Sequence, residues 1–330
     1  MKAHVITQFG DVSVFNKMEL AKPAIKPGYA LVKVHATSVN PIDTKIRAGL
    51  VPHISPVFPA ILHGDIAGTI VEVGEGVKDL KPGDEVFGCV GGVKGEGGAL
   101  ADFIVADANL IAKKPTILSM TEAAALPLVC ITAWEALFEK VKVSSGQQVL
   151  VHAGTGGVGH VAIQLAKWAG AKVYTTVSSE KKSEIVKLLG ADEVINYKTE
   201  SVQDYVNRLT NGKGFEVIFD TVGGANIDNS LSAVANYGHV ITIQARSSHD
   251  LTPLYTKSAS LHAVLMLLPL LSHQQRKRHG EILKQISKLV DEGVIKPLID
   301  PHQFTFDDIA KAHALLESGN AIGKIVLHND

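Results

Sequence analysis

The sequence VLVHAGTGGVG at residues 149–159 decides the fold of this 330-residue chain. It places Gly154, Gly156 and Gly159 in the spacing G-x-G-x-x-G, after an apolar strand and at the start of a predicted helix over residues 157–169. In that setting, backbone N–H groups and the positive end of the helix bind a pyrophosphate, and glycine lets the backbone approach the phosphate oxygens. The stretch therefore predicts a dinucleotide site, with a tight turn that binds nothing as the weaker alternative. The residues expected to contact the dinucleotide here are Gly154, Thr155, Gly156, Gly157 and Val158.

Apolar strands and helices alternate from residue 147 onward. Strands that are apolar throughout, such as VLV and VIF, are buried on both faces, which indicates a parallel sheet covered by helices. Right-handed crossovers make this a doubly wound α/β domain. The predicted strands span residues 149–151, 172–177, 193–195, 215–220 and 239–244. The predicted helices span residues 157–169, 180–189, 201–209 and 226–235, and a longer helix over residues 121–141 precedes them.

The first ~115 residues have a different pattern, that of an all-β, barrel-like unit, because β-branched runs alternate with glycine and proline turns. The last ~60 residues add two amphipathic helices and a strand that complete this unit. We therefore expect a first domain of residues 1–123 completed by residues 270–330, with a nucleotide domain of residues 124–269 inserted between them. The C-terminal elements are predicted at residues 280–290, 307–317 and 324–328.

Composition excludes several classes of protein. Apolar residues make up 46% and charged residues 20% of the chain, which is typical of a folded globular protein. Two cysteines exclude a disulfide scaffold and a four-cysteine zinc lobe, and 32 basic against 33 acidic residues give no net field for nucleic acid. The basic stretch HQQRKRH at residues 273–279 is interpreted as a solvated helix start. The polar N-terminus and the short apolar run at residues 261–271 predict neither a signal peptide nor a membrane span, so we expect a cytoplasmic protein.

The end of the second strand of the nucleotide domain indicates which nicotinamide cofactor binds. An NAD site carries an acidic residue there for the ribose 2′-hydroxyl. This strand ends in TTVSS, and Lys181 and Lys182 follow Glu180. Hydroxyl groups and a cation suit a 2′-phosphate, so the sequence favours NADPH. The alternative for one of the two lysines is a solvated residue at the start of the helix, without a role in binding.

Several further motifs resemble those of the medium-chain dehydrogenase/reductase superfamily, in particular its zinc-independent quinone oxidoreductase group, which includes zeta-crystallin. They follow one another along nearly the whole chain: NPID at 40–43, GDIAG at 64–68, KPGDEV at 81–86, AALP at 124–127, TAWEAL at 132–137, INY at 195–197, DTVGG at 220–224 and GKIVL at 323–327. The resemblance implies a GroES-like β-barrel catalytic domain, a Rossmann domain, a cleft between them for nicotinamide and substrate, and a homodimer formed through the Rossmann sheet edge.

The resemblance also implies roles for individual residues. Lys182, Tyr197 and Ser178 match positions that bind the 2′-phosphate. Asn40 and Thr132 match positions at the nicotinamide end and are the candidate catalytic residues, although ordinary packing is the alternative for Thr132 and Tyr197. The remaining positions that match cofactor-contacting segments are Ile243, Gln244 and Lys324.

The zinc ligands of related alcohol dehydrogenases are replaced in this sequence. The matching positions hold Asn40, Gly64 and Leu128, with Asp65 at the neighbouring acidic position, and none of the first three is a normal zinc ligand. A cluster of His35, His53 and His63 is the alternative metal site, although lone histidines of this kind are more often structural. We therefore expect no metal.

Loss of zinc limits the chemistry. Hydride addition to an isolated carbonyl builds charge on one oxygen, which zinc stabilises as a Lewis acid. A quinone or an α,β-unsaturated carbonyl delocalises that charge, so hydrogen-bond donors can suffice. The sequence therefore predicts NADPH-dependent reduction of quinones or enones. The alternatives are an alkenal reductase with little quinone activity, a zinc-type alcohol dehydrogenase, and a crystallin-like NADPH-binding protein.

Two positions depart from the quinone reductase pattern. Val51 follows the segment Arg47-Ala48-Gly49-Leu50, where quinone reductases often carry tyrosine, and this keeps the enone reductase open as an alternative to the quinone reductase. Asn320 stands where relatives often have arginine. The proton donor is not identified by the sequence.

Overall fold

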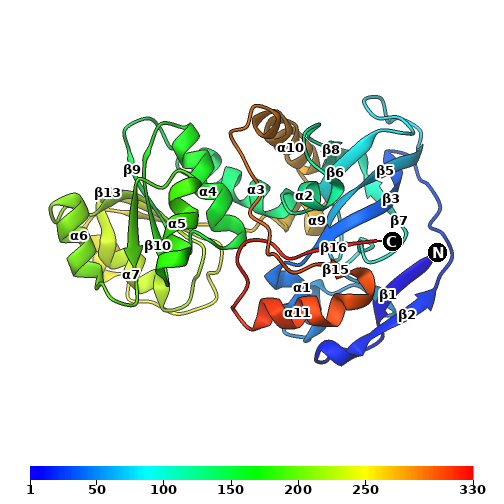
Figure 1. Cartoon of the computed structure of the whole chain (residues 1–330), viewed down its shortest axis with the longest axis horizontal. Coiled ribbons are helices and arrows are strands. Elements are labelled where there is room, and N and C mark those ends of the chain that lie inside the picture. Colours follow the sequence, from blue (N-terminus) through cyan, green and yellow to red (C-terminus); the bar gives the residue numbers. More distant parts are fainter. Residues whose placement is uncertain (330) are drawn as a thin grey trace. The chain divides into compact units, whose positions relative to one another are not determined.

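The computed structural model describes residues 1–329 and divides the chain into two compact units (Figure 1). The first unit comprises Met1–Ile131, Leu267–Gly293 and the chain from Pro297 onward. The second comprises Thr132–Met266 and Val294–Lys296. The division therefore falls after Ile131, within a helix, whereas the expected boundary lies between residues 123 and 124.

The first unit is built mainly of antiparallel strands. Its larger sheet has the order β15-β16-β3-β5-β6-β8, with β7 paired to β3, and its smaller sheet has the order β2-β1-β4. Strands β15 and β16 pair in parallel, unlike the other strand pairs that this unit forms within residues 1–329. The strands are β1 (Lys2–Ile6), β2 (Phe15–Glu19), β3 (Tyr29–Ser38), β4 (Ala60–Ile61), β5 (Asp65–Val73), β6 (Glu85–Cys89), β7 (Phe103–Asp107), β8 (Ile111–Lys113), β15 (Phe304–Thr305) and β16 (Val326–His328). The pairing of β16 with β3 joins the C-terminal segment to the N-terminal sheet, as the predicted completion of the first domain requires.

The first unit also contains short helices within its N-terminal part, which the sequence reasoning missed. Helix α1 (Pro41–Arg47) begins with Asn40 as its N-cap and Pro41 in its first turn, and the Asp43 carboxylate accepts a hydrogen bond from the Asn40 backbone at 2.7 Å. Short 3₁₀ turns lie at η1 (Val12–Val14), η2 (Pro52–Ile54), η3 (Ala108–Leu110) and η5 (Phe306–Asp308). The C-terminal segments add α9 (Leu268–Ser272), α10 (Arg276–Asp291) and α11 (Ile309–Glu317).

The predicted helix over residues 121–141 is interrupted before Pro127 and becomes π-helical after Trp134. It consists of α2 (Met120–Ala124), α3 (Pro127–Trp134) and the π-helical turn η4 (Glu135–Lys140). Proline disfavours the helical conformation of the residue before it and donates no backbone hydrogen bond, so the helix is interrupted ahead of Pro127. Ser119 caps the first segment together with the Glu122 carboxylate.

The second unit is a six-stranded, fully parallel sheet in the order β11-β10-β9-β12-β13-β14. Helices α4 and α5 pack on strands β9, β10 and β11, and α7 packs on β12 and β13. The strands are β9 (Gln148–Val151), β10 (Lys172–Val177), β11 (Glu193–Asn196), β12 (Phe215–Asp220), β13 (Val234–Thr242) and β14 (Ser260–Ala263). The helices are α4 (Gly157–Trp168), α5 (Glu180–Leu188), α6 (Val202–Thr210), α7 (Asn226–Ala233) and α8 (Thr252–Thr256). The predicted fold class, a β-rich unit plus a doubly wound parallel sheet, is confirmed.

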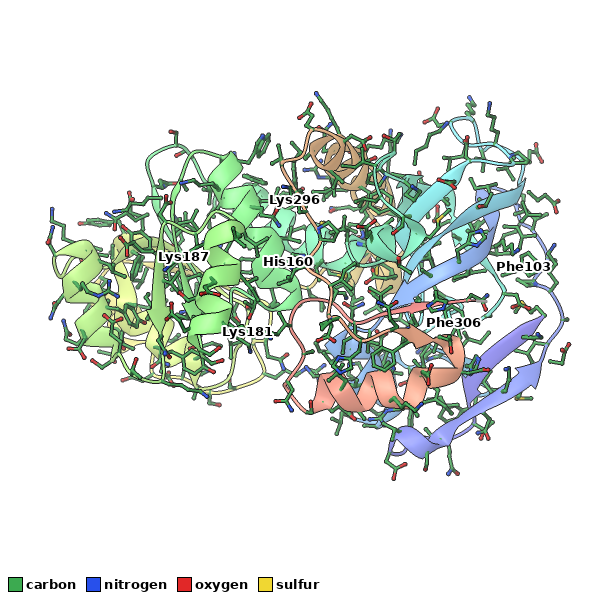
Figure 2. All side chains as sticks on the ribbon, viewed as in Figure 1. Phe103, His160, Lys181, Lys187, Lys296 and Phe306 are labelled. Carbon is green, nitrogen blue, oxygen red and sulfur yellow. The ribbon has the colours of Figure 1, made fainter. Side chains whose placement is uncertain are left out.

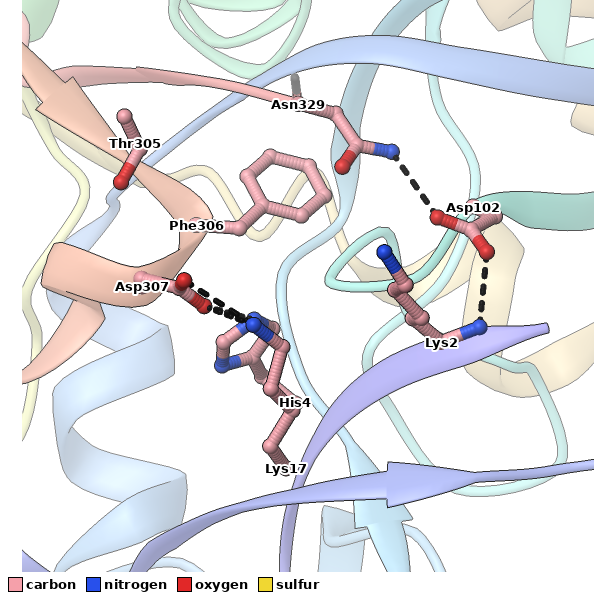
Figure 3. Close-up of a pocket in the computed structure, with 8 residues that line it drawn as sticks. All are labelled: Lys2, His4, Lys17, Asp102, Thr305, Phe306, Asp307 and Asn329. Carbon is pink, nitrogen blue, oxygen red and sulfur yellow. Dashed lines mark hydrogen bonds and ion pairs between the residues drawn. The ribbon is translucent and has the colours of Figure 1, made fainter.

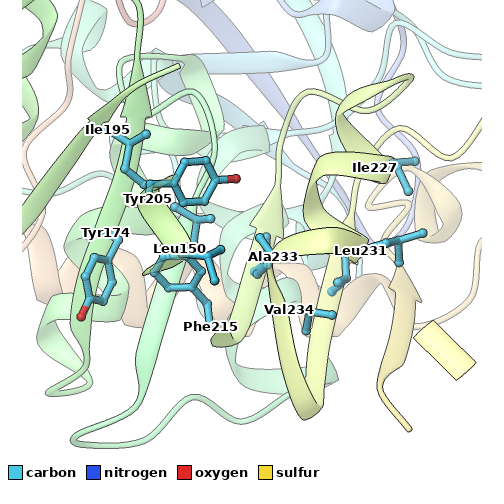
Figure 4. Packing of buried hydrophobic residues seen from close by; sticks show 12 residues of the cluster. Leu150, Tyr174, Ile195, Tyr205, Phe215, Ile227, Leu231, Ala233 and Val234 are labelled. Atoms are coloured by element: carbon cyan, nitrogen blue, oxygen red, sulfur yellow. The ribbon is translucent and has the colours of Figure 1, made fainter. Parts of the chain in front are cut away.

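The core of the second unit forms where the sheet meets its helices (Figure 4). The rings of Tyr174 and Phe215 pack edge to face with their centroids 5.0 Å apart, and Tyr205 packs against the same Phe215 ring. Leu150 on β9 and Ile195 on β11, the strands on either side of β10, are fully buried in this cluster. This packing fixes the strands that carry the glycine-rich loop.

The predicted solvated helix start at residues 273–279 is wrong for two of its residues. Arg276 and His279 are buried, whereas Lys277 is exposed. The Arg276 guanidinium bonds Asp107 at 3.0 Å and also pairs with Glu96, because α10 packs against η3 and β8. Further hydrogen bonds go to the Tyr29 hydroxyl and to the backbone carbonyls of residues 269 and 270. The basic residues around Arg276 do not indicate that it pairs with Glu96 and Asp107, which are distant in the sequence.

Helices that combine the length and the apolar character needed to cross a bilayer are absent from residues 1–329.

Candidate cofactor site and buried polar cluster

The glycine-rich loop of the second unit lies between β9 and α4. Ala153 adopts a positive φ of 53°, and its backbone N–H donates to the Thr176 hydroxyl at 3.0 Å. The Gly154 N–H donates to the Thr176 carbonyl at 3.1 Å, so the turn is bonded to strand β10. Gly156 is the N-cap of α4 and supplies no side chain to the first turn. The first N–H groups of a helix have no partner within the helix, so this end offers donors to an anion.

The glycines of the loop are required for two different reasons. A Cβ at Gly154 would lie 2.2 Å from the Thr175 hydroxyl oxygen, and one at Gly159 would lie 2.2 Å from the Ala153 carbonyl oxygen. Both glycines are therefore needed by the protein's own packing, whether or not a phosphate binds. A Cβ at Gly156 would lie 3.1 Å from the Ala153 carbonyl oxygen and 3.9 Å from the Ala153 Cβ, which are milder contacts. The sequence analysis explained all the glycines of the motif by the close approach of a ligand. Of the three, Gly156 is the one for which this explanation still applies.

Residues expected to bind the 2′-phosphate lie at the carboxyl ends of β10 and β11. Ser178 follows β10 and is half-buried, and Ser179 caps α5 by accepting a hydrogen bond from the Lys182 N–H at 3.4 Å. The Tyr197 N–H donates to the Val177 carbonyl at 3.2 Å, which holds Tyr197 beside the end of β10, with its side chain exposed. Lys182 is half-buried, whereas its neighbour Lys181 at the start of α5 is exposed (Figure 2). The structure thus places Ser178, Lys182 and Tyr197 at one edge of the sheet.

The remaining expected cofactor residues of the second unit are Thr132, Ile243 and Gln244. Thr132 is buried in α3. Ile243 and Gln244 directly follow β13, and a Cβ on Gly223 would lie 2.4 Å from the Gln244 Cβ. Gln244 therefore packs against the turn after β12, on the same carboxyl edge of the sheet as the glycine-rich loop.

Two buried groups at this edge were not identified from the sequence. Asp220 ends β12, and its Oδ1 accepts hydrogen bonds from the backbone of Val222 and Gly223 and from Asn226 at 2.9–3.0 Å. His152 follows β9, and burial lowers its pKa to about 4, although the Asp220 charge acts in the opposite direction. The sequence signal was available, because each is a polar residue at the end of an apolar strand, where parallel sheets bind ligands.

A second group of polar residues is buried in the first unit, around Asp65. The Asp65 carboxylate, at the start of β5, is fully buried and accepts hydrogen bonds from the Ser38 hydroxyl and the Asn40 amide, each at 2.8 Å. Its other oxygen accepts the backbone N–H of Leu128 at 2.8 Å. The Lys324 ammonium lies 3.5 Å from the same carboxylate and donates to the Asn40 amide oxygen and to the Val39 carbonyl. We call Ser38, Asn40, Asp65 and Lys324 the Asp65 cluster.

The structure brings together the positions at which related dehydrogenases bind zinc. Asn40 and Leu128 both bond to Asp65, and Gly64 adjoins it in sequence. A Cβ at Gly64 would lie 2.8 Å from the Gly91 carbonyl oxygen and 3.1 Å from the Cys89 sulfur, so the packing leaves no space for an imidazole. An amide, a backbone N–H and a carboxylate already paired with an ammonium do not form a zinc ligand set. The residues present therefore do not fit zinc.

The two thiols near Asp65 are also poor ligands. Burial raises the pKa of Cys89 and of Cys130 well above the usual thiol value, and the Asp65 charge adds to the effect. A neutral thiol binds metal weakly because the thiolate is the ligand.

The alternative histidine cluster is not assembled. His35 bonds the Thr69 hydroxyl, His63 stacks on His313 with their Nε2 atoms 2.9 Å apart, and His53 lies in the exposed turn η2. Within residues 1–329, no group of three or more histidine, cysteine or acidic side chains is arranged to hold a metal ion.

Asp43, one turn into α1, is a buried carboxyl group beside the Asp65 cluster. Burial raises its pKa to about 7, and the negative charge of Asp65 acts in the same direction. The hydrogen bond from the Asn40 backbone and the Lys324 charge lower it by a smaller amount. This carboxyl group therefore titrates near neutral pH.

A separate surface pocket of the first unit contains none of the expected site residues (Figure 3). Two of its basic side chains face one carboxylate: Asp307 lies 2.7 Å from the Lys17 ammonium and 3.2 Å from the His4 ring. Asp102 accepts the backbone N–H of Lys2 at 2.7 Å. We assign no function to this pocket.

Comparison with known proteins identifies the family. A family model described as "Alcohol dehydrogenase GroES-like domain" matches residues 26–116, and one described as "Zinc-binding dehydrogenase" matches residues 189–327. The 2-methylene-furan-3-one reductase of Solanum lycopersicum is 37% identical over 99% of this chain and 79% of its own length. The quinone oxidoreductase of Rattus norvegicus is 31% identical over 99% of this chain and 97% of its own length.

A solved structure shares the whole fold. An alcohol dehydrogenase superfamily protein from Novosphingobium aromaticivorans has a TM-score of 0.95 and 40% sequence identity, covering 100% of both chains. A GroES-like unit joined to a parallel-sheet unit with a glycine-rich loop defines an oxidoreductase that uses a nicotinamide cofactor. The chain belongs to the medium-chain dehydrogenase/reductase superfamily, in its zinc-independent quinone oxidoreductase group, which confirms the resemblance found in the sequence.

Proposed function

We propose that this chain is an NADPH-dependent reductase of quinones and α,β-unsaturated carbonyl compounds that acts without zinc. The observation that carries the proposal is the Asp65 cluster, in which the positions of the zinc ligands hold an amide and a backbone N–H bonded to a carboxylate that Lys324 neutralises. A site of this composition offers hydrogen-bond donors but no Lewis acid, and this suits acceptors that delocalise the incoming negative charge.

NADPH is favoured over NADH by the residues after β10. Hydroxyl and ammonium groups at Ser178, Lys182 and Tyr197 suit a phosphate dianion, and strand β10 ends without a carboxylate that would repel it. The N–H groups at the start of α4 suit the pyrophosphate. When bound, the cofactor supplies a hydride from C4 of its nicotinamide ring.

The chain's own residues hold and orient the reactants. Asn40 and Thr132 are the candidates for contact with the nicotinamide end, as their match to the family motif suggests. The Asn40 amide nitrogen carries two hydrogens and gives one to Asp65, which leaves the second as a donor to a ligand oxygen. Hydride transfer leaves an enolate or a hydroquinone monoanion, and each of these takes up one proton, which water can deliver.

Both acceptor classes, enones and quinones, have support. Val51 is apolar and buried where quinone reductases often carry tyrosine. The relative from Solanum lycopersicum is named for an exocyclic enone, whereas the rat relative is named for quinones. Both classes therefore belong in the test.

We also propose a homodimer formed through the edge of the parallel sheet. Strand β14 lies at the edge of that sheet and pairs with β13 on one side only. Leu261 on this strand is 37% exposed and Leu265 just after it is 59% exposed, so pairing with a second copy would cover both. Sedimentation of the purified chain tests this; a monomer at micromolar concentration would contradict it.

The deciding experiment for the function is an NADPH-oxidation screen across enones, quinones and saturated aldehydes, with and without a chelator. We expect turnover of the first two classes, little turnover of saturated aldehydes, and no effect of the chelator. Chelator-sensitive oxidation of simple alcohols together with stoichiometric zinc would indicate a zinc-type alcohol dehydrogenase instead. Tight NADPH binding without turnover of any acceptor would indicate a non-catalytic binding protein.

A further inference from the structure

Lys324 is held inside the first unit by its backbone and by its side chain. Its N–H donates to the Leu298 carbonyl at 2.8 Å, and its carbonyl accepts the Asp300 N–H at 2.9 Å. The preceding Gly323 has a φ of 77°, and a Cβ there would lie 2.1 Å from the Leu298 carbonyl oxygen. The Lys324 residue is only 3% exposed. An ammonium buried to this degree has a defined set of partners, and it is not a mobile surface charge.

The partners of this ammonium are three oxygen atoms. They belong to the Val39 carbonyl at 3.1 Å, the Asn40 amide and, at 3.5 Å, the Asp65 carboxylate. One positive and one negative charge make the Lys324–Asp65 pair neutral, and the hydrogen bonds from Ser38 and Leu128 satisfy the rest of the carboxylate. Lys324 was expected to contact the cofactor, but in this structure its amino group is fully occupied within the first unit.

The two charges determine which way the Asn40 amide faces. Its oxygen lies against the Lys324 ammonium and its nitrogen lies 2.8 Å from the Asp65 carboxylate. Rotation of the amide by 180° would place NH₂ against the ammonium and oxygen against the carboxylate, so two attractive contacts would become two repulsive ones. An asparagine without these neighbours could present either a donor or an acceptor. Here the oxygen of the buried amide accepts from Lys324 and one N–H donates to Asp65, so the hydrogen that these contacts leave over is the second N–H.

We propose that Lys324 is a positioning residue that acts through Asn40: its ammonium fixes the amide so that the remaining N–H is always offered as a donor to a carbonyl oxygen of the bound reactants. The inference rests on the proposed function, because it gives a role to the Asn40 contact assumed there. The carbonyl can belong to the nicotinamide carboxamide or to the conjugated acceptor, and the experiment below separates the two. The Lys324 ammonium thereby supplies a positive charge beside Asn40, one of the positions at which zinc-dependent relatives bind the metal.

Two single variants and their combination test this role. Lys324→Met removes the charge but keeps most of the side-chain volume, and Asn40→Ala removes the amide. If Lys324 acts through Asn40, each single variant lowers kcat by about a hundredfold, the cost of a misplaced reacting group, and the combination is hardly slower than either alone. The control Lys311→Met removes an exposed lysine paired with Asp308 and should leave activity unchanged.

A further variant separates positioning from stability. Lys324→Met leaves the buried Asp65 charge without its partner and should lower the thermal midpoint of the apo-protein. Lys324→Met/Asp65→Asn removes both charges, so the midpoint should recover while kcat stays low. Recovery of both the midpoint and kcat in this variant would overturn the proposal, because Lys324 would then serve only to neutralise Asp65.

Binding measurements locate the carbonyl. Affinity for NADPH is read from the quenching of tryptophan fluorescence, since Trp134 and Trp168 both lie in the second unit. A weaker affinity in Lys324→Met/Asp65→Asn points to the nicotinamide carboxamide, and an unchanged affinity with reduced kcat points to the acceptor; both outcomes support the proposal. If the wild-type chain turns over and the loss of kcat in Lys324→Met/Asn40→Ala equals the product of the two single losses, Lys324 does not act through Asn40. That result overturns this inference and leaves the proposed function standing. A wild-type chain without any turnover overturns the proposed function and this inference with it.

Discussion

Replacement of Lys182 by alanine tests the cofactor assignment most directly. The Lys182 backbone N–H bonds the Ser179 hydroxyl at the start of α5, and alanine keeps that bond, so the helix should begin unchanged. A charge-assisted hydrogen bond contributes about 1.5–3 kcal/mol. The side chain is half-buried and not enclosed, so screening by water places the expected loss near the lower end, about 2 kcal/mol. That corresponds to about a thirtyfold weaker affinity for NADPH.

The assay is a titration of tryptophan fluorescence with NADPH and, separately, with NADH. Affinity for NADH should hardly change, because NADH lacks the phosphate that Lys182 is proposed to bind. The matched control is Lys181→Ala, which removes the adjacent exposed charge and should cost less than about fivefold. Equal losses with the two cofactors, or a larger loss at Lys181 than at Lys182, would refute the reasoning.

Other substitutions test the fold and the two sites. Arg276→Met leaves two buried carboxylates without their partner and should lower the free energy of unfolding in urea by about 3–5 kcal/mol; a loss below about 1 kcal/mol would show that water compensates them. The pKa of Asp43 is about 7 in the folded state and about 4 in the unfolded chain. Between these pH values the native state holds a proton that the unfolded chain has lost. The contribution of Asp43 to the free energy of unfolding therefore falls as pH rises from about 4 to about 7. Asp43→Asn should therefore gain stability relative to wild type from pH 4 to 7, and parallel stability profiles would contradict this. Gly154→Ala should lower both the thermal midpoint and NADPH affinity through its contact with Thr175, whereas Gly156→Ala should mainly lower affinity; the reverse ranking in calorimetry and binding would contradict the assignment.

The second unit was largely predictable because its signals are local. The strands predicted at residues 172–177 and 215–220 match β10 and β12 residue for residue. A short run of mostly apolar or β-branched residues bounded by turns predicts a buried strand of a parallel sheet. The predicted helix over residues 226–235 ends instead at Ala233, and β13 begins immediately afterwards at Val234. Tyr237 has a φ of 62° within that strand and its register shifts there, a bulge for which the sequence carries no periodic signal.

The first unit was less predictable because its decisive contacts join distant segments. Arg276 pairs with carboxylates 180 and 169 residues away, so a pattern in the surrounding sequence cannot distinguish it from a solvated charge. Helix α1 was missed because several of its buried positions carry polar side chains, among them Asp43 and Arg47, and hydrophobic periodicity does not register them. Asn40 and Asp65 were singled out from the sequence as aligned positions, but the partner that joins them, Lys324, is 284 residues from Asn40.

The charges of the Asp65 cluster balance each other among its own side chains. A zinc site balances a divalent cation with thiolate charge, and removal of the metal alone would leave buried anions unpaired. This chain has no ionisable ligand at the three positions, keeps the single carboxylate of Asp65 and supplies one ammonium from Lys324, so the pair remains neutral. Asn40→Cys would place a thiol beside the buried Asp65 charge, and burial together with that charge would raise its pKa, as both do for Cys89. Such a cysteine stays a neutral thiol while the Lys324–Asp65 pair is intact, so this single substitution does not create the thiolate that a zinc site needs.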